Sequence, residues 1–359
     1  MATSAPRTRV ERATDADRAA WDGFVAARPE GDVLQLWAWG EVMAGAGEPP
    51  ARIVVRATDG RLRGVAQALV RSTAFGRTVL YVPHGPLWER DAPDAETVLG
   101  SLLGGLRDLG RAVRGIVVKV DPRGRPVGDG TDSDTIAAGL RAAGLRPARF
   151  DLQARMTNMV TIEADPHARM AGWSADARNL VRRGAREGTI VDMHRDADRE
   201  SVQTFTDLLR KAGGGTRFRI HPPGFYIALA EALAPFGGWF LAIARFEGRP
   251  VAAVVVTRVA DRAYYVYGAS DHDAPRQAYG SYAAMATVFE ALAIDGVRTF
   301  DLWGVADPND PKADPSWTGF SAFKRHFGGA DFRHPGAFDL VVDPLWWRLR
   351  DLRERTVRR

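Results

Sequence analysis

The sequence contains no cysteine. This absence excludes disulfide bonds, thiolate zinc sites and cysteine nucleophiles. A chain without cysteine does not depend on an oxidising compartment, so we expect it in the cytoplasm. Any covalent catalysis would have to use another kind of side chain.

Long apolar stretches are also missing. No run approaches the ~18–20 apolar residues that a membrane-spanning helix needs, and the first eleven residues have no apolar core typical of a secretion signal. Hydrophobic residues make up 45% and charged residues 26% of the 359 residues. These proportions are typical of a soluble globular protein with room for two domains.

Lysine is scarce, because arginine takes almost every positive position. The four lysines are Lys119, Lys211, Lys312 and Lys324. A net charge of +5 and a sequence pI near 9.7 favour anionic partners such as nucleic acid, phosphorylated molecules or anionic lipid. Against this arginine-rich background, each remaining lysine is a candidate for a specific role.

Two halves of the chain repeat one order of elements. Each half is predicted to run strand, charged glycine turn, strand, aromatic strand, long helix, strand. Thr58-Asp-Gly-Arg61 in the first half corresponds to Phe246-Glu-Gly-Arg249 in the second, and both sequences are typical of hairpin turns. We therefore predict two copies of one α/β unit with mixed sheets.

The stretch from Ser316 to Gly329 combines aromatic and basic residues. Phe320, Phe323 and Phe327 have the spacing of one helical face, which predicts that this face is buried. Lys324 lies beside this face, where a cation could occupy a partly dry site. The alternative is a short amphipathic helix whose basic edge is solvated. Gly328-Gly329 is expected to end the helix.

Other signals in the sequence are weak. The aspartates around 271–273 and 307–314 lack metal-ligand spacing, so we expect no metal site. No Ser/His/Asp set shows a nucleophile elbow. The pattern Arg107-x-x-Gly110-x-Ala112 fits a coenzyme A phosphate loop, but it falls late in a predicted helix.

Several ordered motifs together resemble one family. They are Tyr81-Val-Pro-His-Gly-Pro86, the basic run Ser174–Gly188, Tyr264-Tyr-Val-Tyr-Gly-Ala-Ser270, Thr299-Phe-Asp-Leu-Trp-Gly304 and Gly319–Gly329. Their order across the chain is similar to that of the FemABX family, in a compact form without a coiled-coil arm. That family transfers amino acids from aminoacyl-tRNA to the peptide stem of peptidoglycan precursors.

The resemblance implies two tandem GNAT-like acyltransferase domains. The first would span residues 1–153 and receive a C-terminal helix at 340–359, and the second would span 154–339. It also implies an aminoacyltransferase with aminoacyl-tRNA as co-substrate and no bound cofactor. A nucleotide- or lipid-linked precursor would be the acceptor, the chain would act as a monomer, and a peripheral contact with the inner face of the membrane stays open.

The resemblance further implies candidate site residues. The Phe323-Lys324 pair would be catalytic. Lys324 would stabilise the oxyanion that forms when an amine attacks the tRNA ester, or it would contact the tRNA end. His84 and Glu89 would contact the precursor; a loop histidine and a solvated glutamate are the alternatives. Tyr267 could bind substrate or pack in the core.

The remaining candidates are arginines. Arg217 and Arg219 could clamp a pyrophosphate, because guanidinium groups match phosphate oxygens. Arg178, Arg182 and Arg183 share one basic helix, which would bind tRNA or precursor phosphates, or form a solvated face.

One departure concerns the acceptor. The family often carries a lysine after the tryptophan of its first-domain Gln-x-x-x-Trp segment, whereas Trp39 here is followed by no cation as far as Met43. Other acceptors therefore stay open: tRNA-dependent or acyl-coenzyme A-dependent acylation of another peptide or metabolite amine, or a non-catalytic module that binds RNA or precursor.

Overall fold

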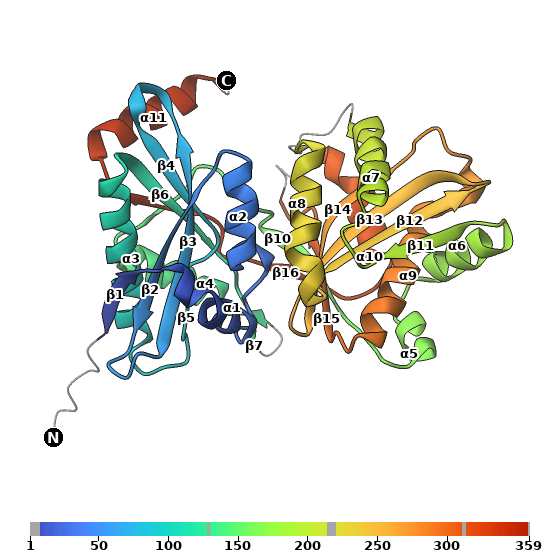
Figure 1. Cartoon of the computed structure of the whole chain (residues 1–359), viewed down its shortest axis with the longest axis horizontal. Coiled ribbons are helices and arrows are strands. Elements are labelled where there is room, and N and C mark those ends of the chain that lie inside the picture. The colour runs from blue at the N-terminus through green and yellow to red at the C-terminus, as the bar shows by residue number, and fades with distance from the viewer. Residues whose placement is uncertain (1–7, 128–129, 214–219, 311–313, 358–359) are drawn as a thin grey trace. The chain divides into compact units, whose positions relative to one another are not determined.

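The computed structural model describes residues 8–127, 130–213, 220–310 and 314–357, and side chains of the last helix as far as Leu352 (Figure 1). The chain forms two compact units, one of residues 1–155 with 333–359 and the other of residues 156–332. The sequence predicted that the second unit ends at residue 339. It ends at residue 332, and the chain returns to the first unit before residue 339 because strand β17 (Phe338–Val341) pairs with β6 (Gly115–Pro122) of the first unit.

The first unit is built on a mixed sheet with helices packed against it. The strand order is β1 (Arg9–Arg12), β2 (Pro50–Arg56), β3 (Leu62–Ser72), β4 (Thr78–His84), β6, β17 and β9 (Arg146–Pro147), and β5 (Leu87–Trp88) pairs with β3. The helices are α1 (Arg18–Ala26), α2 (Trp37–Gly45), α3 (Ala95–Ala112), α4 (Ser133–Ala142) and α11 (Pro344–Val357).

Strand alternation explains how α3 and α11 both find an apolar surface. Leu80 and Val118 join the core beneath α3, whereas their neighbours Val79 and Val117 pack against the tryptophans of α11. Successive residues of a strand point to opposite faces, so α11 covers the face that α3 does not. The predicted return of the C-terminal helix to the first unit is thus present.

The second unit repeats the arrangement. Its strand order is β11 (Ile190–His194), β12 (Trp239–Phe246), β13 (Arg249–Val259), β14 (Arg262–Ser270), β15 (Thr299–Gly304), β10 (Met156–Thr161) and β16 (Ala330–Arg333). The helices are α5 (Pro166–Ala171), α6 (Ala175–Arg186), α7 (Arg199–Ala212), α8 (Pro223–Leu233), α9 (Gly280–Ile294) and α10 (Thr318–Arg325).

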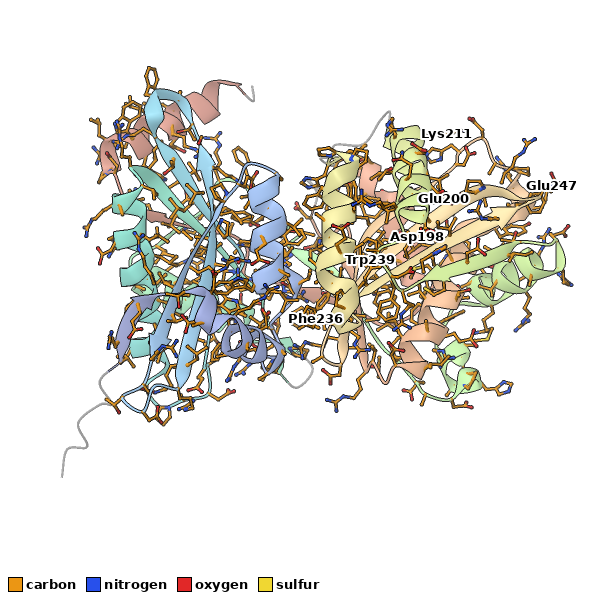
Figure 2. The ribbon with its side chains drawn as sticks, in the orientation of Figure 1. Asp198, Glu200, Lys211, Phe236, Trp239 and Glu247 are labelled. Atoms are coloured by element: carbon orange, nitrogen blue, oxygen red, sulfur yellow. The ribbon has the colours of Figure 1, made fainter. Side chains whose placement is uncertain are left out.

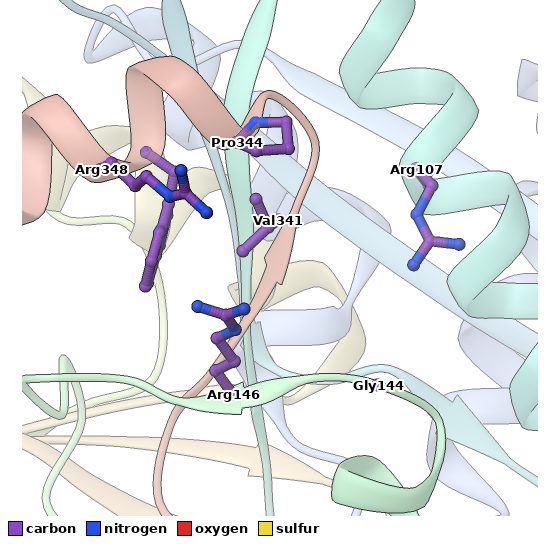
Figure 3. A pocket seen from close by; sticks show the side chains of 7 residues that line it. Arg107, Gly144, Arg146, Val341, Pro344 and Arg348 are labelled. Atoms are coloured by element: carbon purple, nitrogen blue, oxygen red, sulfur yellow. The ribbon is translucent and has the colours of Figure 1, made fainter.

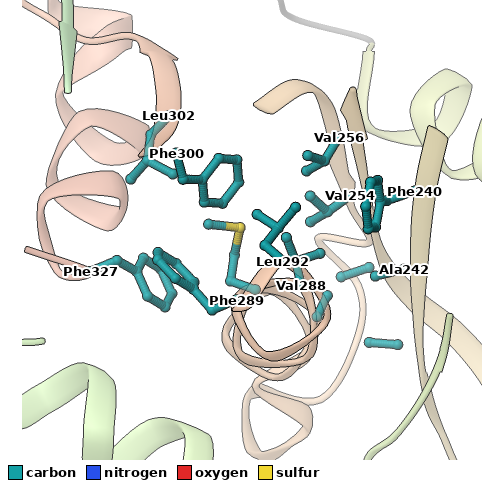
Figure 4. Packing of buried hydrophobic residues seen from close by; sticks show 14 of the residues in the cluster. Phe240, Ala242, Val254, Val256, Val288, Phe289, Leu292, Phe300, Leu302 and Phe327 are labelled. Atoms are coloured by element: carbon teal, nitrogen blue, oxygen red, sulfur yellow. The ribbon is translucent and has the colours of Figure 1, made fainter. Parts of the chain in front are cut away.

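Aromatic side chains fill the core under α9. Phe289 of α9 packs against Phe300 of β15 at 5.2 Å between ring centroids and against Phe327 at 5.5 Å (Figure 4). All three side chains are buried. Since Phe327 directly follows α10, this packing anchors the C-terminal end of that helix to the core.

Short polar side chains fix where two helices of this unit begin. Asp198, labelled in Figure 2, accepts a hydrogen bond from the Ser201 backbone N–H at 2.9 Å, and α7 starts after it. Ser174 accepts from the Ala177 N–H at 3.0 Å at the start of α6. These are N-caps, which satisfy backbone donors that the first helical turn leaves unpaired.

Candidate active site

The two units differ at their pair of central parallel strands. In the first unit β4 and β6 stay paired along their length, from Thr78 opposite Gly115 to His84 opposite Pro122. In the second unit β14 and β15 pair only from Arg262 to Tyr264. Beyond Tyr264 the two strands continue without pairing to each other, so the second sheet opens between them.

Lys324 of α10 lies at this opening. Its Nζ donates a 2.8 Å hydrogen bond to the backbone carbonyl of Gly304, at the end of β15. The same nitrogen lies 5.2 Å from the ring centroid of Tyr265 on β14 and 5.1 Å from that of Phe320. The ammonium therefore contacts both strands where they separate, and it faces two aromatic rings that favour a cation.

Burial changes the acidity of this lysine. The side chain is 7% exposed. Removal from water lowers the pKa of Lys324 to about 7, and the negative charge of Asp301 opposes that change. At neutral pH the group is therefore poised between its charged and neutral forms, unlike a surface lysine.

Asp301 is the counter-charge, and the structure holds it firmly. Its carboxylate accepts hydrogen bonds from the hydroxyl of Thr157 on β10 and, at 2.7 Å, from the backbone N–H of Trp303. It is buried in the middle of β15. Trp303 has a φ of 62°, a left-handed conformation that is rare for a non-glycine residue. These hydrogen bonds fix the position of the carboxylate, whose charge acts on Lys324.

The end of α10 is shaped by its glycine pair. Gly328 and Gly329 both have positive φ, 82° and 78°. A Cβ on Gly328 would lie 2.4 Å from the carbonyl oxygen of Gly172, and one on Gly329 would lie 2.3 Å from that of Met159. Only glycine fits this turn, and the predicted helix stop is confirmed.

Burial within α10 differs from the sequence expectation. Phe327 is buried as predicted, but Phe320 and Phe323 are only half-buried. The buried residues of the helix itself are Ser321 and Lys324. Phe323 packs against Tyr282 and Phe327 at 5.1 and 5.3 Å. The structure therefore gives Phe323 a packing contact and turns Lys324 inward.

Tyr265 and Asp301 were not singled out from the sequence. A β-bulge at Tyr265–Tyr267 makes Gly268 follow Tyr265 on the same side of β14, and a Cβ on Gly268 would lie 1.9 Å from the Tyr265 hydroxyl. The Tyr-x-x-Gly spacing was the available signal. Burial raises the pKa of Tyr265 to about 12, so its hydroxyl stays protonated.

Tyr267, the tyrosine that the sequence singled out as either a substrate-binding or a core residue, has different neighbours from Tyr265. Its ring lies 5.1 Å from Tyr226 of α8 and 6.5 Å from Phe205 of α7. Burial raises its pKa above the ordinary range. These contacts match the packing alternative that the sequence left open.

The basic helix α6 presents two of its arginines to a cavity. Arg178 and Arg182 line a space of about 490 Å³ with His167 and Met170 of α5. Arg178 also donates to the Trp173 carbonyl, and the guanidinium of Arg183 lies 5.0 Å from the Tyr279 ring. Arg182 is exposed.

His84 and Glu89 lie in ion-pair networks of the first unit. His84 is buried and contacts the Asp32 carboxylate, to which Arg123 also donates at 3.0 Å. Glu89 receives hydrogen bonds from Arg61 and Arg63. Neither side chain is a freely solvated loop residue.

Arg217 and Arg219 lie outside the described residues. Within the described ranges, no cluster of three or more His, Asp or Glu side chains could hold a metal ion. No helix in the described part is long and apolar enough to cross a membrane.

Similarity to known proteins shows the fold class to which the chain belongs. Residues 174–317 match the acetyltransferase (GNAT) domain family. The fold matches the crystal structure of FemX with a TM-score of 0.80 and 20% identity, over 95% of this chain and 99% of that one. A tandem GNAT protein from the clavulanic acid biosynthesis pathway matches with a TM-score of 0.59 and 13% identity, over 94% and 99% of the two chains. The chain is a tandem GNAT-fold protein.

Relatives that are similar in sequence point to one family within this fold class. The chain is 23% identical to lipid II:glycine glycyltransferase of Staphylococcus aureus, over 93% of this chain and 94% of that protein. The chain is homologous to this enzyme, and together with the FemX fold this supports the FemABX family that the sequence motifs predicted.

Proposed function

We propose that this protein is an aminoacyltransferase that adds an amino acid to an amine of a peptidoglycan precursor stem peptide, in the cytoplasm. The homology to lipid II:glycine glycyltransferase over both units carries this proposal. The donor would be aminoacyl-tRNA and no cofactor would be needed. The basic character of the chain, with its net charge of +5, suits a nucleic-acid donor.

The opening between β14 and β15 supports placing the reaction in the second unit. An amine that attacks the tRNA ester forms a tetrahedral oxyanion, and a donor held in a dry site stabilises that charge more than water does. Lys324 Nζ uses one hydrogen on the Gly304 carbonyl and has two further hydrogens as a cation. The ester carbonyl would accept one of them.

The neighbouring groups would help Lys324 to stay charged, as an oxyanion donor must be. Asp301 favours the charged form of the lysine, and the Tyr265 and Phe320 rings face the ammonium. Arg178 and Arg182 of α6 would bind phosphates of the tRNA. No covalent enzyme intermediate is required, because the acceptor amine itself is the nucleophile.

The decisive experiment is incubation with a pool of charged tRNAs and nucleotide-linked or lipid-linked precursor, with product mass as the readout. We expect a mass increase of one amino acid on the precursor. Transfer from acetyl-coenzyme A together with no mass increase on any precursor would overturn the proposal.

A matched pair of variants tests the lysine. Lys324→Met should lower kcat/KM by roughly 10²- to 10³-fold, the cost of one oxyanion donor. Lys211→Met is the control: Lys211 (labelled in Figure 2) is about half exposed and pairs with Asp271 at 2.8 Å. Equal turnover by wild type and Lys324→Met would remove Lys324 from the mechanism.

Acylation of another amine from acyl-coenzyme A is the second candidate. The match of residues 174–317 to an acetyltransferase domain is the observation that favours it. A module that binds RNA or precursor without turnover is the third, and binding of charged tRNA with no product would identify it.

A further inference from the structure

The C-terminal helix α11 leaves an apolar stripe uncovered. Leu345, Leu349 and Leu352 are 67%, 51% and 57% exposed. Their spacing of four and three residues puts them on one face of the helix. The two tryptophans of this helix, Trp346 and Trp347, face the sheet instead. They pack against Val79, Ile116 and Val117. The stripe is therefore not the surface by which α11 is held to the first unit.

A fourth exposed apolar side chain lies against α11. Phe75, in the turn between β3 and β4, is 78% exposed and lies 5.6 Å from the Trp346 ring. Burial of large exposed side chains of this kind removes apolar area from water, and a contiguous exposed group of them marks an interaction surface.

Arginines border the opposite side of the stripe. Arg348 is one turn from Leu345, and together with Arg107 of α3 and Arg146 of β9 it lines a cavity of about 180 Å³ (Figure 3). Trp347 and Pro344 form its apolar wall. Among the side chains that the structure describes, none of the three arginines forms an ion pair with a carboxylate.

The acidic residues near these arginines are already paired. Asp339 binds Lys119 at 2.6 Å, Asp343 pairs with Arg77, and Asp351 lies 3.8 Å from Arg149. The local carboxylates therefore leave the positive charge of the cavity uncompensated. An arginine cluster of this type matches phosphate oxygens.

We propose that Phe75, the leucine stripe of α11 and the arginines Arg107, Arg146 and Arg348 form a docking surface for an anionic lipid bilayer. A helix with leucines on its outer face and arginines beside them lies in a membrane interface, with its apolar face at the acyl boundary and its cations at lipid phosphates. A soluble phosphate compound would use the arginines but not the four exposed apolar side chains. The proposed contact is peripheral, with the helix lying along the bilayer surface.

This surface has a consequence for the acceptor, which rests on the proposed function. A chain held at a bilayer meets a lipid-linked precursor at high local concentration. A nucleotide-linked precursor is soluble and gains nothing from the contact. Loss of the surface should therefore impair transfer to the lipid-linked acceptor in vesicles and leave transfer to the nucleotide-linked acceptor unchanged.

The test is sedimentation of the full-length protein with vesicles of phosphatidylcholine, with and without phosphatidylglycerol. We expect binding to the anionic vesicles, and a loss of roughly tenfold or more in affinity for Leu345→Glu/Leu349→Glu. Ile294→Glu is the control, because Ile294 is 79% exposed on a helix of the second unit. Its binding should equal that of wild type.

The arginines are tested separately. Arg107→Gln/Arg348→Gln should reduce the preference for anionic over zwitterionic vesicles. The proposal is overturned if wild type ignores anionic vesicles, if the leucine variant binds as wild type does, or if the leucine variant instead loses binding to tRNA. Vesicle binding needs no turnover, so this result is independent of whether the transferase reaction is found.

Discussion

The pKa of Lys324 can be measured directly, and it links the burial of this side chain to its proposed role in the reaction. Its ordinary value is 10.5, and burial lowers it to about 7. The unfolded chain therefore holds this proton over a pH range in which the folded chain has released it. Since the unfolded state binds more protons there, the free energy of unfolding contributed by Lys324 rises with pH.

The size of this effect follows from linkage. Each pH unit between the two pKa values changes the free energy of unfolding by about 1.4 kcal/mol. Because Lys324 is half-titrated near the start of the interval, the gain from about pH 7 to about pH 9 is about 2 kcal/mol. Lys324→Met lacks this contribution, so the difference in stability between wild type and variant should change by this amount.

The scarcity of lysine makes a direct assay simple. Protein labelled at the lysine Cε carbon should give four signals in a carbon NMR spectrum, one for each lysine. Lys324→Met identifies the signal of interest by its disappearance. We expect that signal to titrate with a midpoint near 7, whereas hydrogen bonds to Asp271 and Asp273 raise the pKa of the exposed Lys211 above the ordinary lysine value.

Two outcomes would refute this reasoning. If the signal of Lys324 titrates in the ordinary lysine range, Lys324 is hydrated and the site is not dry. If the lysine titrates near 7 but transfer rises as it loses its proton, the neutral amine acts as a base. The oxyanion role requires the opposite sign: the component of kcat/KM that depends on Lys324 should fall as pH rises through about 7.

Two further predictions concern the stability of each unit. Gly328→Ala should destabilise the second unit by about 2 kcal/mol or more, because its φ is 82° and the new methyl group would meet the carbonyl oxygen of Gly172. Gly319→Ala, which meets nothing within 4 Å, is the control, and urea unfolding followed by tryptophan fluorescence measures both. Asp32→Ala should destabilise the first unit by about 3–5 kcal/mol, since Arg123 and His84 lose the buried carboxylate between them. The pKa of Asp32 is lowered, so its contribution is retained at neutral pH and is lost only on acidification below the ordinary range; a thermal transition that Asp32→Ala leaves unchanged would contradict this account.

Local sequence patterns predicted much of the architecture. Charged glycine turns located the hairpins between β2 and β3 and between β12 and β13, and the similarity of these turns revealed the repeated α/β unit. Gly328-Gly329 located the end of α10. Such signals are readable because turns and helix ends require particular backbone angles that few residues adopt.

The burial of Lys324 could not be read from its helix. Helical spacing predicted that the phenylalanines would be buried and placed the lysine beside them. In the structure the lysine points inward, because Gly304, Tyr265 and Asp301, from two strands elsewhere in the sequence, provide the carbonyl, the ring and the counter-charge. Nothing in the local sequence records the identity of these neighbours.

The sequence by itself determined the family resemblance, the repeated unit and the identity of the lysine to test. Only the tertiary structure decided that β14 and β15 separate while β4 and β6 remain paired, and therefore which unit carries the opening. It alone showed that α11 buries its tryptophans and exposes its leucines. The physical reason is that propensity and capping act within a few residues, whereas desolvation and exposure depend on atoms brought together from distant parts of the chain.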